Sequence, residues 1–162
     1  MYKDITVPEN NSLKKEIKEM LSWLDKKEAD NELGRTTFAP ACTEEKMAAW
    51  ESANGIKIPE SYKEWLRFTE ECTIDGTTAQ FFGPDHFRTD YVPENLIVIG
   101  EVVGDGEQVC FDKETGEIVN YFEGSLTKAS KSFIDRIQSV NDYLGDGGMS
   151  PEAEALFEKM FG

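Results

Sequence analysis

The 162-residue sequence has one histidine and three cysteines, and no two cysteines are spaced as CxxC. An odd set of scattered cysteines argues against a disulfide framework and a zinc knuckle, and it favours a reducing compartment, so we expect a cytoplasmic protein. Long apolar runs are missing as well, since the longest, at 96–99, has the length of a strand. We expect no membrane partner, and the first residues lack the basic and apolar segments of a secretory signal.

Nucleotide-binding loops are also missing, because neither GxxxxGKS/T nor GxGxxG occurs. In the stretch GDGEQVCFDKETGEIVNYF, at 104–122, the first glycines stand beside acidic residues, whose charges repel phosphate. Asp112, Glu114 and Glu117 offer alternating carboxylates, but they do not match the spacing of a calcium-binding EF-hand loop. We therefore predict no cofactor and no metal, and we interpret the stretch as a β-hairpin with a polar, glycine-containing turn.

Acidic side chains dominate the charge: 32 Asp and Glu stand against 17 Lys and Arg, a formal net charge of −15. Such a field repels nucleic acid, whose binding needs cations at its phosphates, and it repels anionic lipid surfaces. It attracts basic proteins and speeds their association. Solubility alone explains the same composition, because acidic side chains keep a protein in solution. Composition leaves both explanations open.

The hydrophobic pattern changes from a helical period to a strand period near residue 75. The expected helices are one capped at Asn11–Ser12 and reaching Leu24, one at 43–54, one that starts at Pro59, and one that runs from Ser130 or Ser132 to Leu144. The expected strands are 78–82, 96–99, 108–112 and 117–121. The predicted fold class is α+β, with a small, mainly antiparallel sheet (a meander) packed against helices. We expect one domain over 1–144, followed at 145–162 by a flexible joint and a short C-terminal helix.

The predicted meander carries much of the acidic charge, because eight acids between Glu94 and Glu123 stand against Lys113 alone, a net charge of −7. On a twisted meander, several of these side chains would share one side or gather at the turns. A solvated face is the simpler explanation from patterning alone. If the face binds a partner, we expect contacts from these carboxylates and nearby aromatic anchors: Asp105, Glu107, Asp112, Glu114, Glu117, Tyr121 and Phe122.

The sequence offers little from which to build a catalytic centre. Nucleophilic catalysis needs an activated group beside a base, and the conceivable combination is Cys110 or Cys72 with His86. A small, buried, apolar role explains either cysteine more simply. The acids are too numerous for a glycosidase pair to stand out. We predict no enzyme, and a small Cys–His hydrolase remains the third alternative.

Two segments, in this order, carry a family pattern. Residues 50–66, WESANGIKIPESYKEWL, combine a helix, a Gly-hydrophobic step, Ile-Pro, Tyr and an aromatic-Leu pair. The second half has IGE at 99–101, then GDG, VCFD and TGEIV, a strand–turn–strand series. Together they resemble the SUKH superfamily over about residues 40–144. One departure is TEEC at 69–72, where that family usually has Asn-Gly.

The resemblance implies a SUKH-like fold and a binding module without a catalytic centre. Bacterial members are commonly immunity proteins that neutralise polymorphic toxins, often nucleases, while eukaryotic members resemble regulatory scaffolds. We therefore predict a cognate protein toxin of basic charge as the partner, and no nucleic acid. The acidic surface would occlude a basic active site by imitating phosphate charge. The alternative is a regulatory or scaffold protein of the same fold with no toxin partner.

Overall fold

The computed structural model describes residues 1–102, 106–145 and 159–160, and its contacts divide the chain into two compact units. One unit combines the two ends of the chain, Met1–Leu33 and Ile134–Gly162, and the other is Gly34–Phe133. Most of the joint and the tail helix predicted at 145–162 lies outside the described residues. Within the described residues, no helix is both long and apolar enough to cross a membrane.

The terminal unit is built on α1 (Lys14–Ala29) and α4 (Ile134–Leu144), which contact each other. Asn141 Nδ2 donates a hydrogen bond to the Glu16 carbonyl, 3.1 Å away. A short 3₁₀ helix, η1 (Tyr2–Asp4), is attached to α1 because its first two backbone N–H groups donate to the Asp25 carboxylate at 2.7 and 3.0 Å. The first helix has Leu13 at its N-cap position, one residue after the expected Asn11–Ser12 cap. The apolar side chains along its inner face are all buried: Leu13, Ile17, Met20, Leu21 and Leu24.

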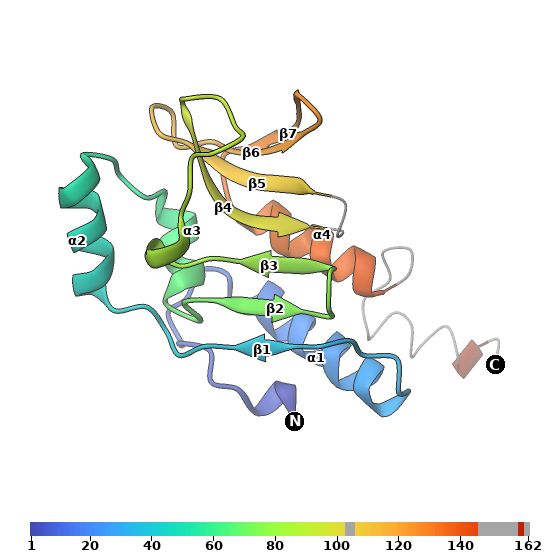
Figure 1. Ribbon diagram of the computed structural model, residues 1–162. Helices are drawn as coiled ribbons and strands as arrows, with labels where there is room; N and C mark the ends of the chain where they lie inside the picture. Colours follow the sequence, from blue (N-terminus) through green and yellow to red (C-terminus); the bar gives the residue numbers. More distant parts are fainter. Residues whose placement is uncertain (103–105, 146–158, 161–162) are drawn as a thin grey trace. The chain divides into compact units, whose positions relative to one another are not determined.

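The unit Gly34–Phe133 contains a seven-stranded antiparallel sheet whose strands lie side by side in chain order, counted over the described residues (Figure 1). The strands are β1 (Thr37–Phe38), β2 (Cys72–Ile74), β3 (Ala79–Phe81), β4 (Leu96–Val102), β5 (Glu107–Asp112), β6 (Ile118–Phe122) and β7 (Ser125–Ser130). The meander predicted from β3 to β6 is confirmed. It is longer than predicted, because β1, β2 and β7 extend it at both edges.

Two helices of the same unit begin and end where their sequences indicate. In α2 (Glu44–Asn54) the Thr43 side chain accepts a hydrogen bond from the Lys46 N–H at 3.1 Å, so Thr43 is the N-cap. Gly55 ends this helix in the left-handed conformation, with φ of 66°. Pro59 precedes α3 (Glu60–Leu66), where its fixed φ is already helical.

An aromatic cluster packs α3 against the sheet. Trp65 lies 5.5 Å from both Phe81 on β3 and Phe133, measured between ring centroids. The buried Tyr62 donates its hydroxyl to the carbonyls of Phe82 and Ile99, at 2.6 and 3.3 Å. Because helices and an antiparallel sheet share this core, the predicted α+β class is confirmed.

Candidate partner-binding surface

The β5–β6 hairpin carries most of the residues predicted to bind a partner. Its strands pair in antiparallel register, with Gln108 opposite Tyr121 and Phe111 opposite Ile118. The turn between them is closed by the Gly116 N–H, which donates to the Asp112 carbonyl at 2.8 Å. Gly116 has φ of 76°, the left-handed conformation that the sequence predicted for a glycine in this turn.

The hairpin separates the predicted residues into two groups. The first group lies at the turn between β5 and β6: Asp112, Glu114 and Glu117. The second group lies at the other end of the hairpin, away from the turn: Glu107, Tyr121 and Phe122. Five residue steps along β5 separate the two ends, about 17 Å at 3.4 Å per residue. Asp105 lies outside the described residues. The described acids of this run therefore do not form one patch.

The turn is fastened to the loop that precedes β4. The Lys113 N–H donates to the Asn95 carbonyl at 2.9 Å, and the Asn95 amide donates to the Asp112 carboxylate at 2.8 Å. Because Glu94 precedes Asn95 in the chain, these bonds bring it to the same end of the sheet as the turn. We call Glu94, Glu114 and Glu117 the turn-end acids.

Asp112 has a structural task within this turn. Its side chain accepts hydrogen bonds from the backbone N–H groups of Glu114 and Thr115, at 2.8 and 3.1 Å. Burial opposes the charged form of Asp112, but these bonds and the Asn95 amide outweigh that effect, so the pKa of Asp112 lies below its usual value. Asp112 thus stabilises the conformation of the turn, because its carboxylate already accepts hydrogen bonds from neighbouring groups of the protein.

The turn-end acids lack such compensation. Glu94 and Glu114 are exposed and Glu117 is half-buried. None of the three forms an ion pair with another of the described residues, although Lys113 is adjacent in sequence. Their negative potential therefore extends into solvent, where it can act on a basic partner.

At the opposite end of the hairpin, the acidic side chains have bonding partners within the protein. Glu107 accepts a hydrogen bond from the Asn120 amide, and Glu101 pairs with Arg88 at 2.6 Å. Tyr121 is half-buried against the hydrophobic cluster that includes Val98 and Cys110. Sequence reasoning missed the Arg88 pair because Arg88 precedes the acidic segment and reaches it only through the fold.

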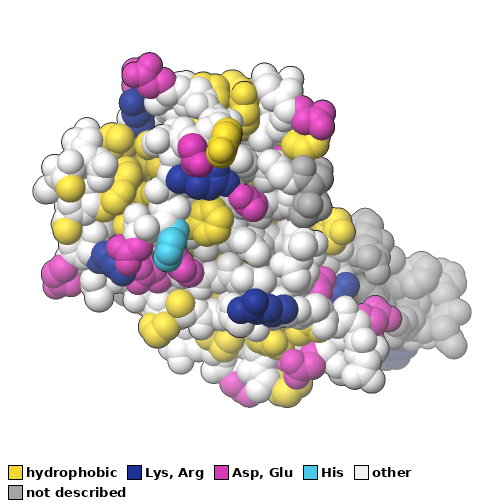
Figure 2. Space-filling view, viewed as in Figure 1, with side chains coloured by type: hydrophobic (Ala, Val, Ile, Leu, Met, Phe, Trp, Pro, Cys, Tyr) yellow, Lys and Arg dark blue, Asp and Glu magenta, His cyan; other side chains and the backbone are white. Residues whose placement is uncertain are grey.

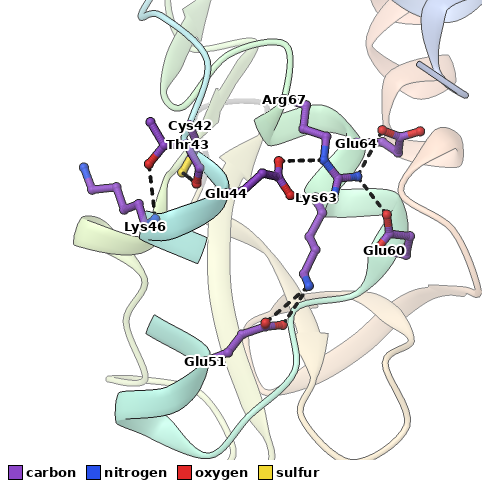
Figure 3. Close-up of polar contacts among 9 residues, drawn as sticks. All are labelled: Cys42, Thr43, Glu44, Lys46, Glu51, Glu60, Lys63, Glu64 and Arg67. Carbon is purple, nitrogen blue, oxygen red and sulfur yellow. Dashed lines mark hydrogen bonds and ion pairs between the residues drawn. The ribbon is translucent and has the colours of Figure 1, made fainter. Parts of the chain in front are cut away.

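A second acidic region, on α2 and α3, is neutralised by Lys63 of α3 and by Arg67, the residue that follows α3 (Figure 3). Arg67 bonds to three carboxylates, with Glu44 at 2.9 Å, Glu60 at 2.7 Å and Glu64 at 3.2 Å. Lys63 pairs with Glu51 at 3.0 Å. These contacts tie the two helices together, so this region contributes to stability more than to attraction of a partner.

Acidic side chains on the face shown in Figure 2 occur in separate groups, several of them beside Lys or Arg. In the described part of the chain, no cluster of His, Cys, Asp and Glu is arranged to hold a metal ion. An open cavity of about 420 Å³ lies over β1–β3. Its floor includes Thr37, Thr73 and Gln80, which are cross-strand neighbours. The lining also includes the charged side chains of Arg35 and Glu71 and the buried Cys72.

The three cysteines are unsuited to nucleophilic catalysis. Burial raises the pKa of Cys72 and of Cys110 to about 12 each, and that of Cys42 to about 11. At pH 7 a thiol with pKa of about 12 is ionised in roughly one molecule in 10⁵. His86 is exposed and its ring contacts the Glu71 carboxylate. The geometry therefore gives the Cys–His hydrolase alternative no activated nucleophile.

The helices and strands occur in the order expected from the resemblance of the sequence to the SUKH superfamily. Residues 41–139, more than half of the chain, match the model of the SMI1 / KNR4 family (SUKH-1). No curated protein matches the chain. The matched range runs from just before α2 into α4 and includes the whole β5–β6 hairpin. The chain therefore belongs to the SMI1 / KNR4 family (SUKH-1).

Proposed function

We propose that this protein is a non-enzymatic immunity protein that binds and neutralises a cognate toxin in the bacterial cytoplasm. The observation that carries the proposal is the set of turn-end acids, which have no cationic partner among the described residues. Membership of the SUKH-1 family is consistent with this role. The buried thiols add support, because they leave the most plausible catalytic alternative without an ionised nucleophile.

The proposed mechanism is occlusion of a basic surface. A toxin that cleaves nucleic acid presents Lys and Arg side chains to phosphates, and the turn-end acids would occupy that positive surface. Long-range attraction would speed encounter, and short contacts would then hold the complex. The remaining predicted contacts, Glu107, Tyr121 and Phe122 at the other end and Asp105 beyond the described residues, belong to the proposal as a second contact region.

The test uses the product of the gene immediately upstream, which this proposal expects to be the toxin. Purified toxin is titrated with this protein, and residual toxin activity is measured at each ratio. Stoichiometric inhibition predicts a linear fall that reaches zero at one equivalent. Inactivation at far lower ratios would indicate turnover and would contradict the proposal.

A matched control separates binding from catalysis. Variants His86→Ala and Cys110→Ala should inhibit at the same stoichiometry as the wild type, because neither residue belongs to the proposed surface. If the wild-type protein forms no complex with the upstream toxin, the immunity role fails, and a regulatory or scaffold role of the same fold becomes the better account.

A further inference from the structure

Tyr91 is the most exposed large hydrophobic residue in the described part of the chain, with 85% of its surface accessible. It lies in the loop between η2 (Pro84–His86) and β4. Its backbone has φ of 65°, in the left-handed region that bulky residues rarely adopt. Asn or Gly would fit this conformation with less strain. Tyr91 therefore combines an exposed aromatic ring with an unfavourable backbone conformation, and neither feature contributes to the packing of the core.

The loop that carries Tyr91 is held in place on both sides. Before it, Arg88 exchanges backbone hydrogen bonds with Val98 on β4, at 2.7 and 3.3 Å. The Arg88 guanidinium also bonds to Asp90 at 3.3 Å and to Glu101 at 2.6 Å. After it, Val92 packs against the cluster that contains Val98. The aromatic ring is thus presented on a restrained loop, which lowers the entropy lost on binding.

The charges around Tyr91 indicate the kind of surface that it fits. Asp90 and Glu94 in the same loop are exposed, and the loop joins the β5–β6 turn through Asn95. Arg88, a cation of the same loop, is already engaged with two carboxylates. A partner surface complementary to this arrangement has an apolar pocket for the ring and Lys or Arg side chains around its rim.

We propose that Tyr91 is the anchor residue of the toxin interface, inserting its ring into an apolar pocket whose basic rim meets the turn-end acids. This inference rests on the proposed immunity function and names the part of the surface that forms the contact. Tyr91 suits the role better than Tyr121, which is half-buried against the protein's own hydrophobic cluster. Aromatic anchors surrounded by polar rims dominate the affinity of many interfaces.

The experiment measures the dissociation constant of the complex with the upstream toxin domain, by calorimetry at fixed ionic strength. Tyr91→Ala should weaken binding by about 30-fold or more, the loss typical of an anchor residue. Tyr91→Phe keeps the ring and should stay within about threefold of the wild type. The matched control is Tyr143→Ala, at another exposed aromatic residue, 55% accessible and located in the terminal unit, and its affinity should not change.

Tyr91→Asn separates an anchoring role from a structural one. Asn accepts the left-handed conformation, so the thermal midpoint should stay equal to or slightly above that of the wild type while affinity falls as in Tyr91→Ala. A lowered midpoint in both variants would show that Tyr91 supports the fold, and would overturn the inference. Unchanged affinity of Tyr91→Ala would overturn it and leave the immunity role standing. Failure of the wild type to bind would overturn both.

Discussion

The hydroxyl of Tyr62 donates a hydrogen bond to the carbonyl of Phe82, 2.6 Å away, and this contact fastens α3 to the end of β3. Phe82 begins the segment that leads through η2 to the Tyr91 loop. A single buried phenol therefore connects the helical layer to the part of the sheet from which the proposed binding surface projects.

Tyr62→Phe should lower the free energy of unfolding by about 1 kcal/mol, because it removes the hydroxyl that donates to the partly buried Phe82 carbonyl. Denaturant unfolding followed by tryptophan fluorescence measures the change. Tyr143→Phe is the control, since Tyr143 is 55% exposed. Equal midpoints for Tyr62→Phe and wild type would contradict the structural role of this bond.

Arg67→Ala should destabilise the protein by about 1 kcal/mol, since it leaves three neighbouring carboxylates without their shared cation. Arg67→Lys should recover only part of the loss, because an ammonium group cannot reproduce the planar geometry of the guanidinium. Added salt should narrow the difference from the wild type. Lys57→Ala, at an exposed position between α2 and α3, is the control and should change little.

Asp112 should make stability sensitive to acid. Its lowered pKa means that its contribution is present above the usual carboxyl pKa and is lost as the pH falls through the folded-state value. Asp112→Asn keeps one acceptor oxygen for the turn but does not titrate, so its stability should fall less steeply between neutral and acidic pH. Unfolding midpoints measured across that range test the prediction, and identical slopes for the two proteins would refute it.

The cysteines should be unreactive in the folded protein. With the pKa of Cys72 and Cys110 raised to about 12 by burial, a thiol reagent at pH 8 should modify them only after denaturation. Because their folded-state pKa values exceed the unfolded value, the stability linked to these thiols is present below about pH 8.5 and is lost as the pH rises further. Rapid native-state labelling of Cys110 would contradict its burial.

Reversing the turn-end acids, by Glu94→Lys, Glu114→Lys and Glu117→Lys together, should slow association with the toxin about tenfold or more at low salt. The salt dependence of the association rate should weaken, because the steering charges are gone. Stopped-flow mixing measures both quantities.

The charge-matched control for this reversal is Glu9→Lys, Glu28→Lys and Glu32→Lys, which changes the net charge equally in the terminal unit. Equal slowing in both triple variants would mean that overall charge, and no particular surface, attracts the partner. Association at the wild-type rate in the turn-end variant would exclude steering by these acids.

Sequence patterns predicted elements that local interactions define. Thr43, Gly55 and Pro59 mark helix boundaries through bonds and backbone angles within a few residues, and the structure confirms all three. The strand β1 was missed because two residues are too few to show a period. The strand β2 has three residues, as β3 does, but it lacks the Asp-Gly turn signal that precedes β3 in the sequence. The strand β7 was missed because nearly all of it is exposed, so it shows no alternation, and because its hairpin turn is Glu123–Gly124 in place of a more usual Asn-Gly.

The sequence by itself determined the family, the α+β class and the excess of negative charge, since these follow from composition and from short patterns in order. Only the tertiary structure decided which carboxylates are paired within the protein and which direct their negative potential into solvent. Strand register places Glu107 about 17 Å from Asp112, brings Arg88 to Glu101 and leaves the turn-end acids without an ion pair among the described residues. The physical reason is that ion pairing and burial depend on contacts between segments distant in the chain, which hydrogen-bond register fixes and local sequence does not encode.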